Sequence, residues 1–82
     1  MVKLPLTLAD VPLGKRARIR DIESGSPLGR RLLDLGFVPG TSVVAIRRAP
    51  FGDPIAVMVR GSLYGLRHNE ARLIQLEDSD HE

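Results

Sequence analysis

Hydrophobic and polar residues alternate along several short stretches of this chain, as expected for strands with one buried and one exposed face. In residues 16–23, arginines alternate with Ala17 and Ile19, and Ile22 breaks the alternation, which predicts a β-bulge at that point. Residues 41–48 are rich in β-branched side chains, which favour extended structure. The same reasoning predicts four more strands, at residues 41–48, 55–60, 63–67 and 73–76.

One segment has helical instead of strand periodicity. Ser26 can cap a helix, Pro27 suits its first position, and Gly36 suits a left-handed stop, so a helix is predicted over residues 27–35. Its apolar stripe must pack on other elements, because a helix this short is marginal in water. The stripe consists of Leu28, Leu32 and Leu35.

The connections contain typical turn residues. Pro39-Gly40 fits a type II turn and Gly61-Ser62 a two-residue type II′ hairpin turn. Short helical turns are expected near residues 7–11, with Leu8 and Val11 buried, and near residues 69–72, capped at Asn69. Phe37, next to the helix stop, is expected in the core.

Short strands separated by turns, with one inserted helix, predict a small antiparallel barrel of about five strands. Closure or partial closure removes the exposed edges that a small sheet would otherwise present. The leucine face of the helix is expected to cover one mouth of this barrel. The fold class is therefore mainly β.

A chain of 82 residues has room for a single domain, which we expect over residues 1–76, followed by an acidic, flexible tail over residues 77–82. So small a domain has no spare interior for a deep substrate cavity. Cysteine is absent, which removes disulfides and thiolate chemistry and favours a reducing compartment. No apolar run approaches the roughly 20 residues that cross a bilayer. A cytoplasmic protein is expected.

The net charge of +2 is unevenly distributed, because residues 1–76 are basic and the tail is acidic. Four of the ten acidic residues lie in the tail, so residues 1–76 carry twelve Lys and Arg against six Asp and Glu. A basic surface of this kind can bind nucleic acid, an acidic protein face or anionic lipid, or it can serve only to keep the protein soluble. Aromatic residues make up only 4 % of the chain, which argues against stacking on bases.

Two features are candidates for partner binding. Arg16, Arg18 and Arg20 share one face of a strand, where they form either a solvated face or a docking row for carboxylates. Arg30-Arg31 and Arg47-Arg48 would extend that row if the barrel brings them close. Phe51, at the tip of a proline-bounded loop over residues 49–54, is either folded back on the barrel or presented to a partner.

Catalytic and metal chemistry find little support. Neither histidine lies in a nucleophile-like context, and phosphate loops or paired catalytic carboxylates are not visible in the sequence. His68 has only Glu70 nearby, and His81 lies in the tail beside Asp78 and Asp80, whereas ferrous sites draw on several convergent ligands. We expect no enzyme activity, no cofactor and solvated histidines.

Four motifs resemble the FeoA family of bacterial ferrous iron transport proteins in order and spacing, from Leu8 to Ala71. They are Leu8-x-x-Val11-x-x-Gly14, Leu32-x-x-Leu35-Gly36-Phe37-x-Pro39-Gly40, Gly52-Asp53-Pro54 and Leu66-Arg67-x-x-Glu70-Ala71. Phe51, His68-Asn69 and the acidic tail depart from the usual family pattern. These departures concern partner specificity and leave the fold unaffected.

The resemblance implies an SH3-like barrel and an accessory role beside the permease FeoB, whose soluble part is a GTP-binding domain. The partner would be that permease, the membrane would be reached only through it, and an open sheet edge would allow weak self-association. The alternative is a nucleic-acid-linked or metal-responsive regulatory barrel. It is disfavoured because the sequence contains neither a major-groove reading helix nor stacking aromatics.

Overall fold

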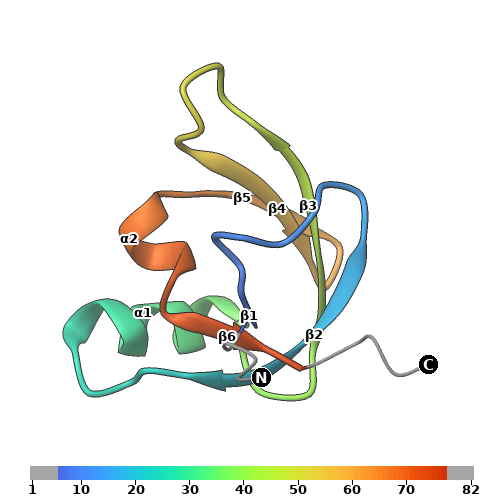
Figure 1. Ribbon diagram of the computed structural model, residues 1–82. Helices are drawn as coiled ribbons and strands as arrows, with labels where there is room; N and C mark the ends of the chain where they lie inside the picture. Colours follow the sequence, from blue (N-terminus) through green and yellow to red (C-terminus); the bar gives the residue numbers. More distant parts are fainter. Residues whose placement is uncertain (1–5, 78–82) are drawn as a thin grey trace, which may run out of the picture.

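A computed structural model describes residues 6–77 (Figure 1). The expected acidic tail lies outside the described residues except for Glu77, and so does His81. The fold is mainly β, as predicted, with six strands instead of about five because a two-residue strand precedes the others. The elements are β1 (Leu6–Thr7), β2 (Arg16–Ile22), α1 (Pro27–Leu35), β3 (Ser42–Arg48), β4 (Ile55–Val59), β5 (Ser62–Leu66), α2 (His68–Ala71) and β6 (Ile74–Leu76).

The strands form one antiparallel sheet in the order β1-β6-β2-β3-β4-β5. β2 turns the corner of this sheet: its first half, residues 16–18, pairs with β3, and its second half, residues 19–22, pairs with β6. The register shifts between Ile19 and Asp21, so Arg20 is the extra residue of a bulge. The bulge predicted at Ile22 therefore lies two residues earlier. A bulge increases local twist, which lets one strand serve two parts of a curved sheet.

The core lies on the inner side of the curved sheet. Alternate residues of β2, β3 and β4 are buried, as the period of two requires, and the residues between them face outward. Phe37 is completely buried, as predicted, and so are Leu8 and Val11. The buried strand residues are Ala17, Ile19, Ile22, Val43, Ala45, Ile55, Val57, Val59, Leu66, Ile74 and Leu76.

The predicted helix and its start and stop signals are confirmed. The Ser26 hydroxyl accepts a hydrogen bond from the Gly29 amide at 3.1 Å, and Gly36 ends α1 in the left-handed region at φ 112°. Leu32 is buried and Leu35 packs partly against the core, but Leu33, not Leu28, completes the set. The first turn of α1 instead meets backbone, because Gly29 lies directly against Glu23 and Ser24.

β5 holds the end of α1. The Tyr64 hydroxyl donates to the Leu35 carbonyl at 3.4 Å, and the Tyr64 ring lies 5.6 Å from the Phe37 ring between centroids. The aromatic pair and this hydrogen bond fix the end of the helix relative to the sheet. In Figure 1 α1 lies at the bottom of the molecule and the loop between β3 and β4 stands at the top.

One of the two predicted tight turns is confirmed and the other is shifted. The Thr41 amide donates to the Val38 carbonyl at 3.1 Å with Gly40 at φ 92°, as a type II turn through Pro39-Gly40 requires. In the β4–β5 hairpin, however, Val59 pairs with Ser62, so the turn residues are Arg60 and Gly61. Both have positive φ, 51° and 81°, which is type I′. The side-chain pairing of the two strands sets this register.

The short elements at the two ends also differ from expectation. Residues 8–10 form a turn after β1, closed by a hydrogen bond from the Asp10 amide to the Thr7 carbonyl, where a helical turn was predicted at 7–11. β1 forms because β6 offers it a pairing partner distant in sequence. The helical turn predicted at 69–72 is α2, which begins at His68, one residue earlier, and its N-cap is Arg67, not Asn69.

Candidate functional site

The arginine row on β2 is exposed along its whole length, as the alternation with Ala17 and Ile19 predicts. Arg16 and Arg18 pair with Val44 and Ser42 of β3, so these two arginines lie on the outer face of the β2–β3 part of the sheet. Arg20 falls in the bulge and has no partner residue opposite it on β6. The row therefore divides between two arginines on the sheet face and one at the corner.

Arg30 and Arg31 form a separate basic site on α1. Both are exposed, and together with Gly25, Pro27 and Asp34 they line a shallow depression on the surface. They come from a different element than the β2 row, and Asp34 places a carboxylate among them. Arg30-Arg31 therefore lie on a helix, apart in the chain from the β2 row that they were expected to extend.

Arg47 and Arg48 have different roles although they are adjacent. Arg47 is exposed, whereas one guanidinium nitrogen of Arg48, Nη2, donates to the carbonyls of Ala9 and Val11 at 3.1 and 3.0 Å. Arg48 thus ties the segment after β1 to the sheet. The Nη2 group of Arg48 is thus used inside the fold, which leaves Arg47 as the exposed member of the pair that was expected to extend the row.

The loop around Phe51 is closed by its own backbone and presents its aromatic side chain outward. The Ala49 amide donates to the Pro54 carbonyl at 3.0 Å, and the Gly52 amide donates to the Ala49 carbonyl at 2.7 Å. Phe51 is 98 % exposed, so it is not folded back on the barrel. An aromatic held out on a closed loop is an unusual use of an apolar side chain, because burial would stabilise the fold.

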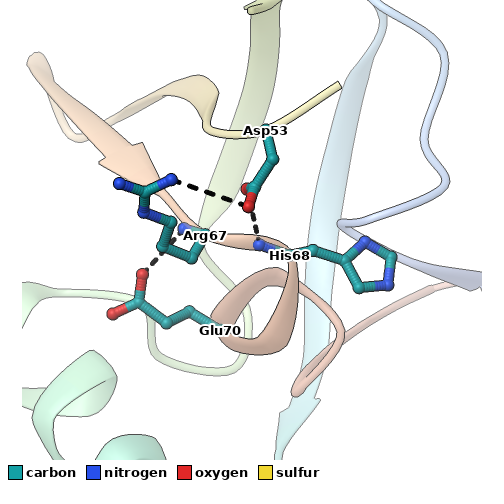
Figure 2. A network of polar contacts seen from close by, with 4 residues as sticks. All are labelled: Asp53, Arg67, His68 and Glu70. Carbon is teal, nitrogen blue, oxygen red and sulfur yellow. Dashed lines mark hydrogen bonds and ion pairs between the residues drawn. The ribbon is translucent and has the colours of Figure 1, made fainter. Parts of the chain in front are cut away.

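A polar network at the base of this loop joins it to α2 (Figure 2). One carboxylate oxygen of Asp53 accepts from the His68 amide at 2.8 Å, and the other lies 3.7 Å from the Arg67 guanidinium. The Glu70 carboxylate accepts from the Arg67 amide at 2.8 Å. Asp53 therefore acts as a cap for α2 supplied from 15 positions away in the sequence, which satisfies an otherwise unpaired amide at the start of the helix.

Sequence reasoning missed this role of Asp53. In the sequence, Gly52-Asp53-Pro54 indicates a loop and matches a family motif, and a capping residue is expected within a few residues of the helix that it caps. The clue in the sequence is the length of the expected helix near residues 69–72, which is only one turn. A helix so short needs support from elsewhere.

The His68 side chain takes no part in this network. Figure 2 shows its imidazole pointing away from Asp53 and Glu70, while only its backbone amide joins the network. Within residues 6–77 there is no group of three or more His, Asp, Glu or Cys side chains arranged to hold a metal ion. Over the same residues, no helix is long and apolar enough to span a membrane.

Comparison with known proteins identifies solved structures with the same fold. The FeoA-like protein of Clostridium acetobutylicum is 31 % identical, with a TM-score of 0.86 and coverage of 99 % of this chain and 94 % of that one. The zinc-complexed FeoA of Stenotrophomonas maltophilia, a prokaryotic SH3 domain protein, is 30 % identical with a TM-score of 0.79, over 88 % of this chain and 89 % of that one. The fold is thus SH3-like.

A relative of known sequence extends this comparison to a larger protein. It is the fusion of Fe(2+) transport protein A with the Fe(2+) transporter FeoB from Porphyromonas gingivalis, which is 28 % identical over 72 residues. The match covers 88 % of this chain but only 8 % of the fusion protein. The FeoA domain model matches residues 6–78 of this chain. The chain therefore belongs to the FeoA family, whose members take part in ferrous iron transport.

Proposed function

We propose that this protein is a non-enzymatic cytoplasmic accessory factor of ferrous iron uptake that binds a FeoB-type GTPase permease and modulates its transport. The observation that carries the proposal is the relative in which a FeoA region and FeoB form one polypeptide. Fusion keeps two domains at a high effective concentration, which is useful when the domains act on each other. A protein that contacts the GTP-binding domain must lie on the cytoplasmic side, where GTP is available.

Two exposed features support a binding role for the surface. Arg16 and Arg18 stand on the outer sheet face and Arg20 at its corner, and arginine pairs bidentately with carboxylates while keeping its charge. Phe51 adds an aromatic anchor on a closed loop. We assign the docking role first to these four residues, and a secondary one to Arg30 and Arg31.

The direct test is binding of the full chain to the FeoB permease of the same cell, reconstituted in nanodiscs with GTP present. The triple change Arg16→Glu, Arg18→Glu and Arg20→Glu is expected to weaken binding at least tenfold at low salt, since it reverses the charge of the row. The matched control is Arg72→Glu, at an exposed position after α2. Equal binding by the triple variant and the control would reject the row, and failure of the unmodified protein to bind would reject the proposed function.

Phe51→Ala probes the loop in the same assay. Because the side chain is almost fully exposed, its removal is expected to leave the thermal unfolding midpoint unchanged. If Phe51 fills a pocket of the permease, binding should fall by about tenfold, the usual effect of losing an aromatic anchor. The rate of GTP hydrolysis in the same nanodiscs, and the rate of iron uptake by the permease reconstituted in closed vesicles, then show whether binding changes transport.

A further inference from the structure

The outer face of β3, β4 and β5 carries apolar side chains at positions where a sheet face turned to water usually carries polar ones. Val44, Met58 and Leu63 are direct neighbours across the three strands, because Val44 pairs with Met58 and Met58 pairs with Leu63. Residues directly opposite each other in an antiparallel sheet share one face. Leu63 is 60 % exposed and Met58 37 %, and Val44 is half-buried.

The next pairs along the strands widen this apolar row. Ala56 lies two residues before Met58 on β4, hence on the same face, and it pairs with Gly65 of β5. Both are small, so this part of the face is flat and leaves the Met58 and Leu63 side chains accessible. The row of four paired positions from β2 to β5 spans about 14 Å at the usual strand spacing.

Arginines border the apolar centre. Arg16 pairs with Val44 at one end of the row, Arg18 pairs with Ser42 beside it, and Arg47 pairs with Ala56. The sequences of β3, β4 and β5 contain no Asp or Glu. Among residues 6–77, the ion pair that forms joins Arg67 to Asp53, away from these three arginines. The face is thus apolar in its centre and cationic at its rim.

We infer that this face, defined by Val44, Ala56, Met58 and Leu63 with Arg16, Arg18 and Arg47 around them, is a docking site for a protein segment whose apolar side chains are flanked by carboxylates. An apolar core with a polar rim rich in arginine is the usual anatomy of a protein interface. Charge complementarity selects the partner. The inference rests on the proposed function for the identity of the partner, which is the FeoB permease.

Other occupants fit less well. A second copy of this chain would bring two arginine-rimmed faces together, and like charges oppose such a contact. Single-stranded nucleic acid needs stacking aromatics, and this face has none. An anionic lipid surface would share the need for arginines and apolar groups, so it is included among the outcomes of the test.

The experiment compares Leu63→Asp with Leu63→Lys in the nanodisc binding assay. Both variants lose the same apolar side chain at an exposed edge-strand position, and thermal unfolding checks that both remain folded. Leu63→Asp should bind at least tenfold more weakly than the unmodified protein because it also repels carboxylates. Leu63→Lys should lose clearly less binding affinity than Leu63→Asp, and Arg72→Glu should bind within twofold of the unmodified protein.

The outcomes distinguish a wrong docking face from a wrong proposed function. If the unmodified protein binds FeoB and Leu63→Asp binds within twofold of it, the docking face is wrong while the proposed function stands. If the unmodified protein does not bind, both are overturned. Two further results would overturn the inference. If the unmodified protein floats with phosphatidylglycerol vesicles that contain no permease and Leu63→Asp abolishes this flotation, the occupant of the face is lipid. If the unmodified protein forms a concentration-dependent dimer in sedimentation and Leu63→Asp abolishes the dimer, the occupant is a second copy of the chain.

Discussion

At the scale of single residues, Gly29 shows that a glycine inside a helix can be required by its neighbours. Alanine is the better helix former by about 1 kcal/mol, so helix propensity alone would favour it at this position. A Cβ at Gly29, however, would overlap the carbonyl oxygen of Glu23 and crowd the backbone of Ser24. Backbone cannot move aside as a flexible side chain does, and α1 therefore approaches the preceding loop only with glycine here.

Gly29→Ala is accordingly expected to destabilise the protein by about 1–3 kcal/mol, as overpacking usually does. Urea unfolding followed by circular dichroism measures this loss. Gly25→Ala is the matched control, because a Cβ there meets nothing within 4 Å, and its effect should stay within about 0.5 kcal/mol. Equal stability of the two variants would contradict the close approach of α1 to Glu23.

At the scale of elements, Asp53 couples the Phe51 loop to α2. The loop closes on itself through Ala49 and Pro54, and Asp53 then reaches the first amide of α2. α2 is only four residues long and gains its stability from such contacts instead of from its own hydrogen bonds. One carboxylate therefore links the Phe51 loop to the start of α2.

Asp53→Ala should cost about 1 kcal/mol of folding stability, the usual effect of losing a helix cap. Hydrogen exchange should rise both in residues 49–53 and in α2, because the two elements lose their common tie. Asp53→Asn keeps an oxygen that can accept from the His68 amide, so it should lose less folding stability than Asp53→Ala. Protection unchanged in α2 with Asp53→Ala would show that the network does not hold the helix.

At the scale of the whole molecule, long-range side-chain contacts complete the small core. The segment that contains Leu8 and Val11 contributes two fully buried side chains, and Arg48 holds it through the carbonyls of Ala9 and Val11. The Gly14 amide adds a hydrogen bond to the Ala45 carbonyl at 2.7 Å. Since a domain of this size has little core to spare, the segment is a necessary part of it.

Arg48→Ala should therefore destabilise the protein by about 2 kcal/mol, because hydrogen bonds from a charged donor to half-buried carbonyls are lost. Arg47→Ala removes the same side chain from an exposed position next to it and should change stability by no more than about 0.5 kcal/mol. Thermal and urea unfolding of the pair give the difference. Similar losses of stability in both variants would mean that the positive charge stabilises the fold, and not the hydrogen bonds from Arg48 to the carbonyls of Ala9 and Val11.

Features with local causes could be predicted from the sequence. Ser26, Pro27 and Gly36 mark the ends of α1 by their own conformational preferences, and Pro39-Gly40 specifies its turn in the same way. The alternation in β2 and β4 gave their buried faces. Features that depend on strand pairing differ from the prediction. These are the bulge at Arg20, the turn at Arg60-Gly61 and the strand β1, each of which is set by a partner strand elsewhere in the chain.

The candidate docking surface illustrates the same division. That Arg16 and Arg18 are exposed followed from the sequence, because a period of two and a charged side chain leave no other place for them. That Val44, Met58 and Leu63 lie in one row with Arg16 was decided only by the tertiary structure, since successive strand pairings bring residues up to 47 positions apart in the sequence onto one face. Local preferences are encoded in neighbouring residues, whereas a surface is assembled by pairing, and pairing depends on the whole core.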